Sequence, residues 1–168
     1  MFARGFTLPE LLVALAILAT LASFATPAWQ AVAERQRLEV LRDQLQADLQ
    51  TARIRALQLG QAVRLSRLTG CAWTTADLTD WSCGWKMELV NGKSPNNASN
   101  VLLSTANPTP AQITTTSMAV TINARGDVSS VGERYVFKSR SAHLGVASVL
   151  LCINNAGRIR KLTGEVCS

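Results

Sequence analysis

The sequence predicts an α+β protein in which one long N-terminal helix packs against an all-β C-terminal domain of antiparallel sheet. Apolar residues recur with a helical period up to Leu59 and with a period of two after Gly60. The chain has 168 residues, of which 48% are hydrophobic and 17% charged. That composition fits a single folded unit and excludes the disordered and collagen-like classes.

The first half of the expected helix is apolar on all sides. Residues 11–33 carry no charge, and a helix of this length crosses a hydrocarbon layer of about 30 Å. We therefore expect a hydrophobic transmembrane and assembly helix over residues 6–33. Pro27 removes one backbone hydrogen bond from it, so a kink or a locally melted turn is expected there.

The second half of the helix is expected to be amphipathic, over residues 34–59. From Leu38 to Leu59 the apolar residues follow spacings of three and four, which places them on one face. Gly60 is suited to end the helix. Charged residues lie mostly off the apolar stripe: Arg35, Arg42, Asp43, Asp48, Arg53 and Arg55.

Residues 34–168 are expected to form the globular domain, with its β part at 60–168. Arg4 and Glu10 are the only charged residues before Glu34, so the whole net charge of +6 lies on this domain. Strands are expected where apolar and polar residues alternate, at 63–66, 85–89, 101–103, 118–122, 135–138 and 146–153, with a last strand after 157. The remainder of 91–117, rich in Asn, Ser, Thr and Pro, is expected to be loop.

The four cysteines are expected to form disulfides, since none of them has the C-x-x-C spacing of zinc or redox sites. Three connectivities are possible. The pairs Cys71–Cys83 and Cys152–Cys167 close the shortest loops and cost the least chain entropy. Disulfides place the domain in an oxidising compartment such as a bacterial periplasm or cell surface.

The N-terminus has the reverse order of a secretory signal, because a short basic leader, residues 1–5, ends in Gly5 before the apolar segment begins. Gly5-Phe6-Thr7-Leu8-Pro9-Glu10 resembles the start of a type IV prepilin. The resemblance implies that a prepilin peptidase cuts after Gly5 and methylates Phe6. The mature chain would then sit in the inner membrane as a single-pass protein. The alternative is an ordinary signal anchor with a stray acidic residue.

Glu10 places a carboxylate in an apolar segment, which is costly unless the group is paired or functional. The resemblance to prepilins implies a role in fibre assembly. There the carboxylate pairs with the amine of Phe6 in a neighbouring subunit.

One helix followed only by strands, with Trp85 and a late Gly-Arg pair, is similar to the GspH/FimT family of minor pilins and pseudopilins. The resemblance implies a pilin-like fold and assembly with other major and minor pilins or pseudopilins. It implies a cell-surface type IV pilus or a periplasmic type II secretion pseudopilus, and does not distinguish them.

The C-terminal segment Asn154-Asn-Ala-Gly157-Arg-Ile-Arg-Lys161 is expected to be a turn followed by a strand. Arg158 and Arg160 would share one face of it, about 6.6 Å apart at ~3.3 Å per residue. That spacing suits neighbouring phosphates, which Arg binds in a bidentate way. Lys161 lies beside them.

In the FimT branch a Gly-Arg-x-Arg segment contacts DNA during uptake for natural transformation, and Gly157, Arg158 and Arg160 match it. The resemblance implies non-specific binding to the phosphate backbone. The alternative is a charged strand edge that prevents edge-to-edge pairing, in a subunit that acts only in assembly. Further basic residues are candidates for outer contacts: Arg64, Arg67, Arg125, Arg134, Lys138 and Arg140.

The sequence favours no enzyme, cofactor or metal site. His143 is the single histidine, and the chain has no Gly-rich phosphate loop and no nucleophile motif. We expect His143 in a loop or at a strand edge. We expect Trp73, Trp81 and Trp85 to pack over the helix, the alternative being stacking on bases or sugars.

Overall fold

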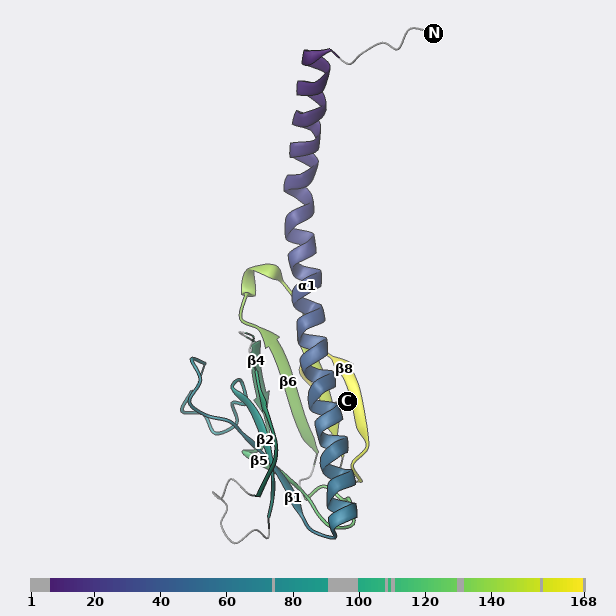
Figure 1. The fold of residues 1–168 in the computed structure, drawn as a ribbon, viewed down its shortest axis with the longest axis vertical. Coiled ribbons are helices and arrows are strands. Elements are labelled where there is room, and N and C mark those ends of the chain that lie inside the picture. Colours follow the sequence, from purple (N-terminus) through teal and green to yellow (C-terminus); the bar gives the residue numbers. More distant parts are fainter. Residues whose placement is uncertain are drawn as a thin grey trace.

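The computed structural model describes residues 7–73, 75–90, 100–107, 109, 111–129, 132–154 and 156–167; for 22–28 it describes the backbone only. Within these residues one long helix lies beside two four-stranded antiparallel sheets (Figure 1). The fold class expected from the sequence is confirmed.

The helix α1 spans Leu8–Leu59, 52 residues, with Thr7 as N-cap and Pro9 in its first turn. It ends at Gly60, whose φ of 61° is left-handed and suits glycine. The helix continues through Pro27, so the locally melted turn expected there is absent. A proline removes a single bond from the ladder, and the flanking turns keep theirs.

In the part of the chain that the structure describes, no helix is long and apolar enough to cross a membrane. The expected membrane segment 6–33 includes Phe6 and the side chains of 22–28, which lie outside that part.

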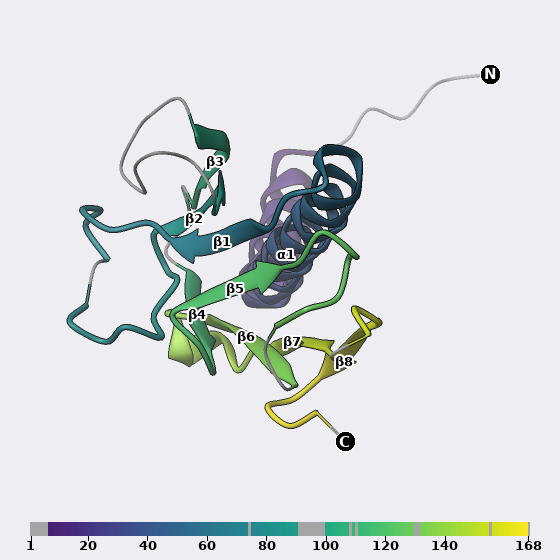
Figure 2. The same cartoon turned by 90° about the horizontal axis from the view of Figure 1, so that it is seen from below.

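The strands form two sheets, each antiparallel throughout. The first, sheet A, has the order β3-β2-β1-β5, and the second, sheet B, the order β4-β6-β7-β8. The view from below shows both sheets gathered around the C-terminal half of α1 (Figure 2). The bounds are β1 Val63–Arg67, β2 Gly84–Leu89, β3 Val101–Ala106, β4 Ala111–Thr115, β5 Ala119–Ile122, β6 Glu133–Ser139, β7 Val149–Ile153 and β8 Ile159–Thr163.

Strand β4 corrects the expectation of a loop before residue 117. Its Ala111 and Ile113 are buried, and it pairs with β6 along its whole length. The segment is polar in composition, but threonine is β-branched and favours strands. Two inward-facing apolar residues between threonines are enough for a half-buried strand.

The core forms where the apolar stripe of α1 meets both sheets. Leu38, Leu45 and Ala52 are fully buried, as are Trp81 and Tyr135. The rings of Trp81 and Tyr135 meet edge to face, with centroids 5.3 Å apart. The amphipathic half of the helix is therefore the surface on which the β domain is built.

Asp48 was expected off the apolar stripe and is instead buried between α1 and sheet A. Its Oδ2 accepts hydrogen bonds from Trp85 Nε1 at 2.7 Å and Thr105 Oγ1 at 2.9 Å. Gln44 donates to Oδ1 at 3.1 Å. A carboxylate can be buried here because these donors replace water.

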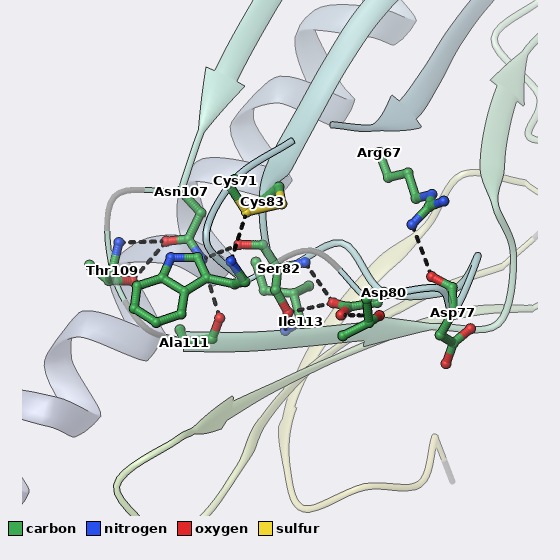
Figure 3. The surroundings of a disulfide bond; sticks show 12 residues. Arg67, Cys71, Asp77, Asp80, Ser82, Cys83, Asn107, Thr109, Ala111 and Ile113 are labelled. Carbon is green, nitrogen blue, oxygen red and sulfur yellow. Dashed lines mark hydrogen bonds between the residues drawn. A yellow bond between two sulfur atoms is a disulfide. The ribbon is translucent and has the colours of Figure 1, made fainter. Parts of the chain in front are cut away.

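The disulfide Cys71–Cys83 closes the long β1–β2 connection, and polar side chains attach that connection to β4 (Figure 3). Asn107 donates to the carbonyl of Ser82 at 2.9 Å and to that of Ala111 at 3.3 Å. The backbone N–H of Ile113 donates to Ser82 Oγ at 3.1 Å. These bonds link sheet A to the first strand of sheet B.

Candidate functional site

The turn between β7 and β8 carries the Gly-Arg-x-Arg segment. Gly157 N–H donates to the carbonyl of Asn154 at 2.8 Å, and Arg158 N–H donates to Asn154 Oδ1 at 2.8 Å. Asn154 N–H in turn donates to the carbonyl of Arg158 at 3.1 Å. One asparagine thus fixes the backbone from which the arginines project.

Gly157 is required here by its conformation and by a close neighbour. Its φ is +72°, in the left-handed region, and a β-carbon at this position would lie 3.0 Å from Nη1 of Arg53 on α1. A β-carbon on Gly126 would lie 3.0 Å from Nε of the same arginine. Arg53 is therefore packed between two glycine turns, which the sequence pattern did not indicate.

The two arginines of the motif are exposed at the free edge of sheet B. β8 is the edge strand, and both Arg158 and Arg160 are exposed. Arg160 pairs in register with Cys152 of β7. Leu162 is two residues further along the strand and packs with Leu150 and Cys152 on the face of the sheet turned away from α1. We call this face the outer face of sheet B.

Lys161 does not join the two arginines. It points to the α1 side of the sheet, where its Nζ lies 3.0 Å from Asp43 Oδ1. Burial raises the pKa of Asp43, but hydrogen bonds from Arg42 and Lys161 outweigh this and hold the pKa below its usual range. Successive residues of a strand point to opposite faces, so only Arg158 and Arg160 of the three expected contact residues lie together.

Both expected disulfides are present, Cys71–Cys83 and Cys152–Cys167. The second lies on the outer face of sheet B beside the arginines. It lines a hollow of about 290 Å³ together with Arg158, Arg160 and Leu162.

Of the six basic residues considered for outer contacts, two share the outer face of sheet B. These are Arg134 and Lys138 on β6, both half-buried. Arg64 and Arg67 lie on β1 in the other sheet and are therefore excluded as candidate contacts, and Arg125 lies in the turn after β5. Arg140 stacks on Trp73, with its Cζ 5.6 Å from the ring centroid.

The remaining aromatic and histidine expectations hold in part. Trp81 and Trp85 are buried in the core, whereas Trp73 is half-buried in the β1–β2 connection under Arg140. His143 is exposed in a short 3₁₀ helix, Ala142–Leu144. Within the described ranges, no group of three or more His, Cys, Asp and Glu side chains is placed to hold a metal ion.

Glu10 lies in the first turn of α1 and is exposed. Its Oε2 is 3.5 Å from the backbone N of Thr7 and 3.4 Å from Thr7 Oγ1. This is the geometry of a capping box, with long contacts. Gly5 and Phe6 lie outside the described residues.

Two family models match the chain. Residues 42–161 match the family of the type II transport protein GspH, and residues 1–26 match the prokaryotic N-terminal methylation motif. No curated protein sequence gives a significant match.

Solved structures with the same fold include two fibre subunits. The chain is similar to the type IV minor pilin FimU of Pseudomonas aeruginosa, with 19% identity and a TM-score of 0.59 over 80% of this chain and 98% of that one. It is also similar to EpsH, a minor pseudopilin of the type 2 secretion system of Vibrio cholerae. There the identity is 10% and the TM-score 0.51, over 76% of this chain and 97% of that one.

The family model covers most of the β domain and the end of the helix, and the methylation motif covers the start of the chain. Pilins and pseudopilins are structural subunits of fibres and not enzymes. The chain belongs to the GspH family, and its fold is that of the type IV pilin-like minor pilins and pseudopilins.

Proposed function

We propose that this chain is a minor pilin that is incorporated into a type IV pilus and binds extracellular DNA there, without sequence preference, for uptake in natural transformation. The observation that carries the proposal is the exposure of Arg158 and Arg160 at the free edge of sheet B. They follow a turn with three hydrogen bonds through Asn154. The backbone from which the two side chains project is thus fixed by hydrogen bonds.

The chemistry supports phosphate as the ligand. Arg160 lies on β8 and Arg158 directly precedes that strand, so their backbones are about 6.6 Å apart at ~3.3 Å per residue, and each guanidinium can take two phosphate oxygens. The candidate contacts come from a strand edge and not from a helix of a size to enter the major groove, so little preference between sequences is expected.

The test uses the full-length chain in a neutral detergent and a fluorescently labelled duplex, over a series of salt concentrations. Two phosphate contacts imply a slope of log affinity against log salt near −1.8, at about −0.9 per contact. Arg158→Gln with Arg160→Gln should remove most of the binding. Arg64→Gln, an exposed arginine on β1 of sheet A, is the matched control. If the double variant binds as well as the wild type, the arginines are only a charged edge.

We also propose the route by which the chain reaches the fibre. The prepilin peptidase cuts after Gly5 and methylates Phe6, and the apolar segment 6–33 holds the chain in the inner membrane as a single-pass protein until assembly. The methylation motif over residues 1–26 supports this route. Glu10 then pairs with the new amine of a neighbouring subunit.

A second candidate function is a subunit for pseudopilus or pilus assembly that does not bind DNA. The pairing of Lys161 with Asp43 and of Lys138 with Glu165 favours it, because both pairs reduce the positive charge offered to a phosphate. The same DNA titration separates the two functions.

A further inference from the structure

A row of three paired residues crosses the outer face of sheet B. Arg134 on β6 pairs with Cys152 on β7, which pairs with Arg160 on β8. Residues that are directly opposite in a sheet point to the same face. The two arginines are therefore on one face, about 10 Å apart at ~4.8 Å per strand.

Lys138 extends the same face along β6. It lies four residues beyond Arg134, so its side chain points to the same side of the sheet. Arg160 and Arg158, in the adjoining turn, line the hollow beside the disulfide Cys152–Cys167, so four cationic side chains border the outer face of sheet B.

The C-terminal tail lies over this face and satisfies two of its cations. Lys138 Nζ is 2.6 Å from Glu165 Oε1, and Arg134 Nη1 donates to the carbonyl of Glu165 at 2.9 Å. Two residues later, Cys167 is bonded to Cys152 in the centre of the row. The tail thus places one carboxylate where a phosphate oxygen would meet Lys138.

The pair Lys138–Glu165 is accessible to an incoming phosphate. The side chains are 40% and 58% exposed. Ion pairs at this exposure contribute little stability and are screened by salt. A polyanion can therefore replace the carboxylate at Lys138 without disturbing the fold.

We propose that the DNA-contacting surface extends across the outer face of sheet B from β8 to β6, with Arg134 and Lys138 as further phosphate contacts, and that Glu165 competes with phosphate for Lys138. The inference rests on the proposed function. In this proposal the C-terminal tail, which the disulfide Cys152–Cys167 attaches to the sheet, also lowers the affinity of the protein for DNA.

The acidic groups near this face limit where phosphates can sit. Glu133 lines the hollow beside Arg158 and Arg160, is buried, and accepts hydrogen bonds from Thr115, Thr116 and Ser117. Its negative charge keeps phosphates out of the hollow. The contacts are then made on the rim, where the cations are.

The experiment measures the affinity of single variants of the full-length chain for a labelled duplex in neutral detergent over a salt series. Arg134→Gln and Lys138→Gln should each weaken binding and make the salt slope shallower by about 0.9. Arg134→Lys keeps the charge and should keep the slope. Glu165→Gln should tighten binding about two- to tenfold at ~0.1 M salt, since it removes a competitor and a charge that repels DNA.

The controls are Arg64→Gln on sheet A and Glu39→Gln, which removes an acidic residue from an exposed pair with Arg35 on α1. Circular dichroism checks that each variant is folded. If Arg134→Gln and Lys138→Gln match Arg64→Gln, or Glu165→Gln matches Glu39→Gln, the extended surface is overturned while the motif itself stands. If Arg158→Gln with Arg160→Gln leaves binding unchanged, the proposed function fails, and this inference with it.

Discussion

At the scale of single residues, Gly157 determines both the conformation of the β7–β8 turn and its close packing against Arg53 of α1. Gly157→Ala should destabilise the protein through its positive φ, at about 1–2 kcal/mol, and through the contact of the new methyl with Arg53. The free energy of unfolding, measured by urea denaturation, gives the sum of these two effects. Gly145→Ala isolates the first effect, since φ there is +59° and a β-carbon has no neighbour within 4 Å.

A double-mutant cycle separates the second effect. In an Arg53→Ala background, Gly157→Ala should cost no more than Gly145→Ala. If Gly157→Ala lowers the free energy of unfolding equally with and without Arg53, the arginine side chain moves aside without cost and does not position the turn.

Asp48 makes a buried polar contact that links α1 to sheet A. Asp48→Ala leaves the indole N–H of Trp85 and the hydroxyl of Thr105 without their acceptor. We expect a loss of about 2–4 kcal/mol in the free energy of unfolding, at ~1–3 kcal/mol for the buried indole N–H and less for the half-buried hydroxyl. Glu39→Ala, an exposed helical carboxylate, should change stability by less than about 1 kcal/mol. A similar effect of the two variants would contradict the role of Asp48.

At the scale of elements, the side chain of Asp80 fixes the conformation of the β1–β2 connection, and this contribution should depend on pH. Burial raises the pKa of Asp80, but hydrogen bonds from Ser82 and Thr75 outweigh this and lower it from 3.8. A carboxyl with a lowered pKa stabilises the fold above its unfolded pKa of about 3.9 and loses this contribution as pH falls.

The melting temperature of the wild type should therefore fall as the pH drops from about 5 towards 2. Asp80→Asn should be less stable at pH 7 and should lose less over the same interval. If wild type and variant give parallel curves, Asp80 does not carry the acid sensitivity.

The disulfide Cys152–Cys167 attaches the C-terminal tail to the outer face of sheet B. Closing a loop of this length stabilises a protein by about 3 kcal/mol, chiefly by restricting the unfolded chain. Replacing both cysteines by serine should lower the free energy of unfolding by that amount. Thermal unfolding with and without a reductant provides the check, since the variant should no longer respond to reduction at this bond.

The elements that the sequence predicted correctly are those with local signals. The buried stripe from Leu38 to Ala56, the stop at Gly60 and most strands follow from periodicity and turn residues, whereas Leu59, expected on the stripe, is exposed. The sequence does not indicate strand β4, because the segment is polar in composition and only Ala111 and Ile113 are buried. Alternation along the strand already places Lys161 on the face opposite to that of Arg160, so grouping Lys161 with the two arginines is wrong. Its pairing with Asp43 depends on tertiary structure.

The wider site could not be predicted for the same reason. Arg134 lies in line with Arg160 only because β6, β7 and β8 pair with one another. Arg53 lies beside Gly157 only because α1 packs against the β7–β8 turn. Neither relation leaves a pattern in the sequence. The short-range disulfides, in contrast, follow from loop length.

At the scale of the whole molecule, the first half of α1 stands clear of the β domain (Figure 1). Large apolar side chains before residue 22 are exposed there, among them Leu8, Leu12, Ile17 and Leu21. An apolar surface of this extent requires a covering environment, which fits a subunit that passes from a membrane into a fibre.

Glu10 is the one charge on this surface before Glu34, and it has two candidate roles. One is capping the helix through Thr7, and the other is docking on a neighbouring subunit. Glu10→Gln separates them, since glutamine can still accept a capping bond but carries no charge. Thr7→Val removes the capping hydroxyl and keeps the charge.

If Glu10 acts in docking, Glu10→Gln should remain in the membrane fraction yet be depleted from sheared fibres, while Thr7→Val assembles normally. Immunoblots of membranes and sheared fibres measure both. Mass spectrometry of the same material should find Phe6 as a methylated N-terminus. Incorporation of Glu10→Gln at the wild-type level would leave Glu10 with the capping role alone, and recovery of an intact Met1 would contradict the proposed processing.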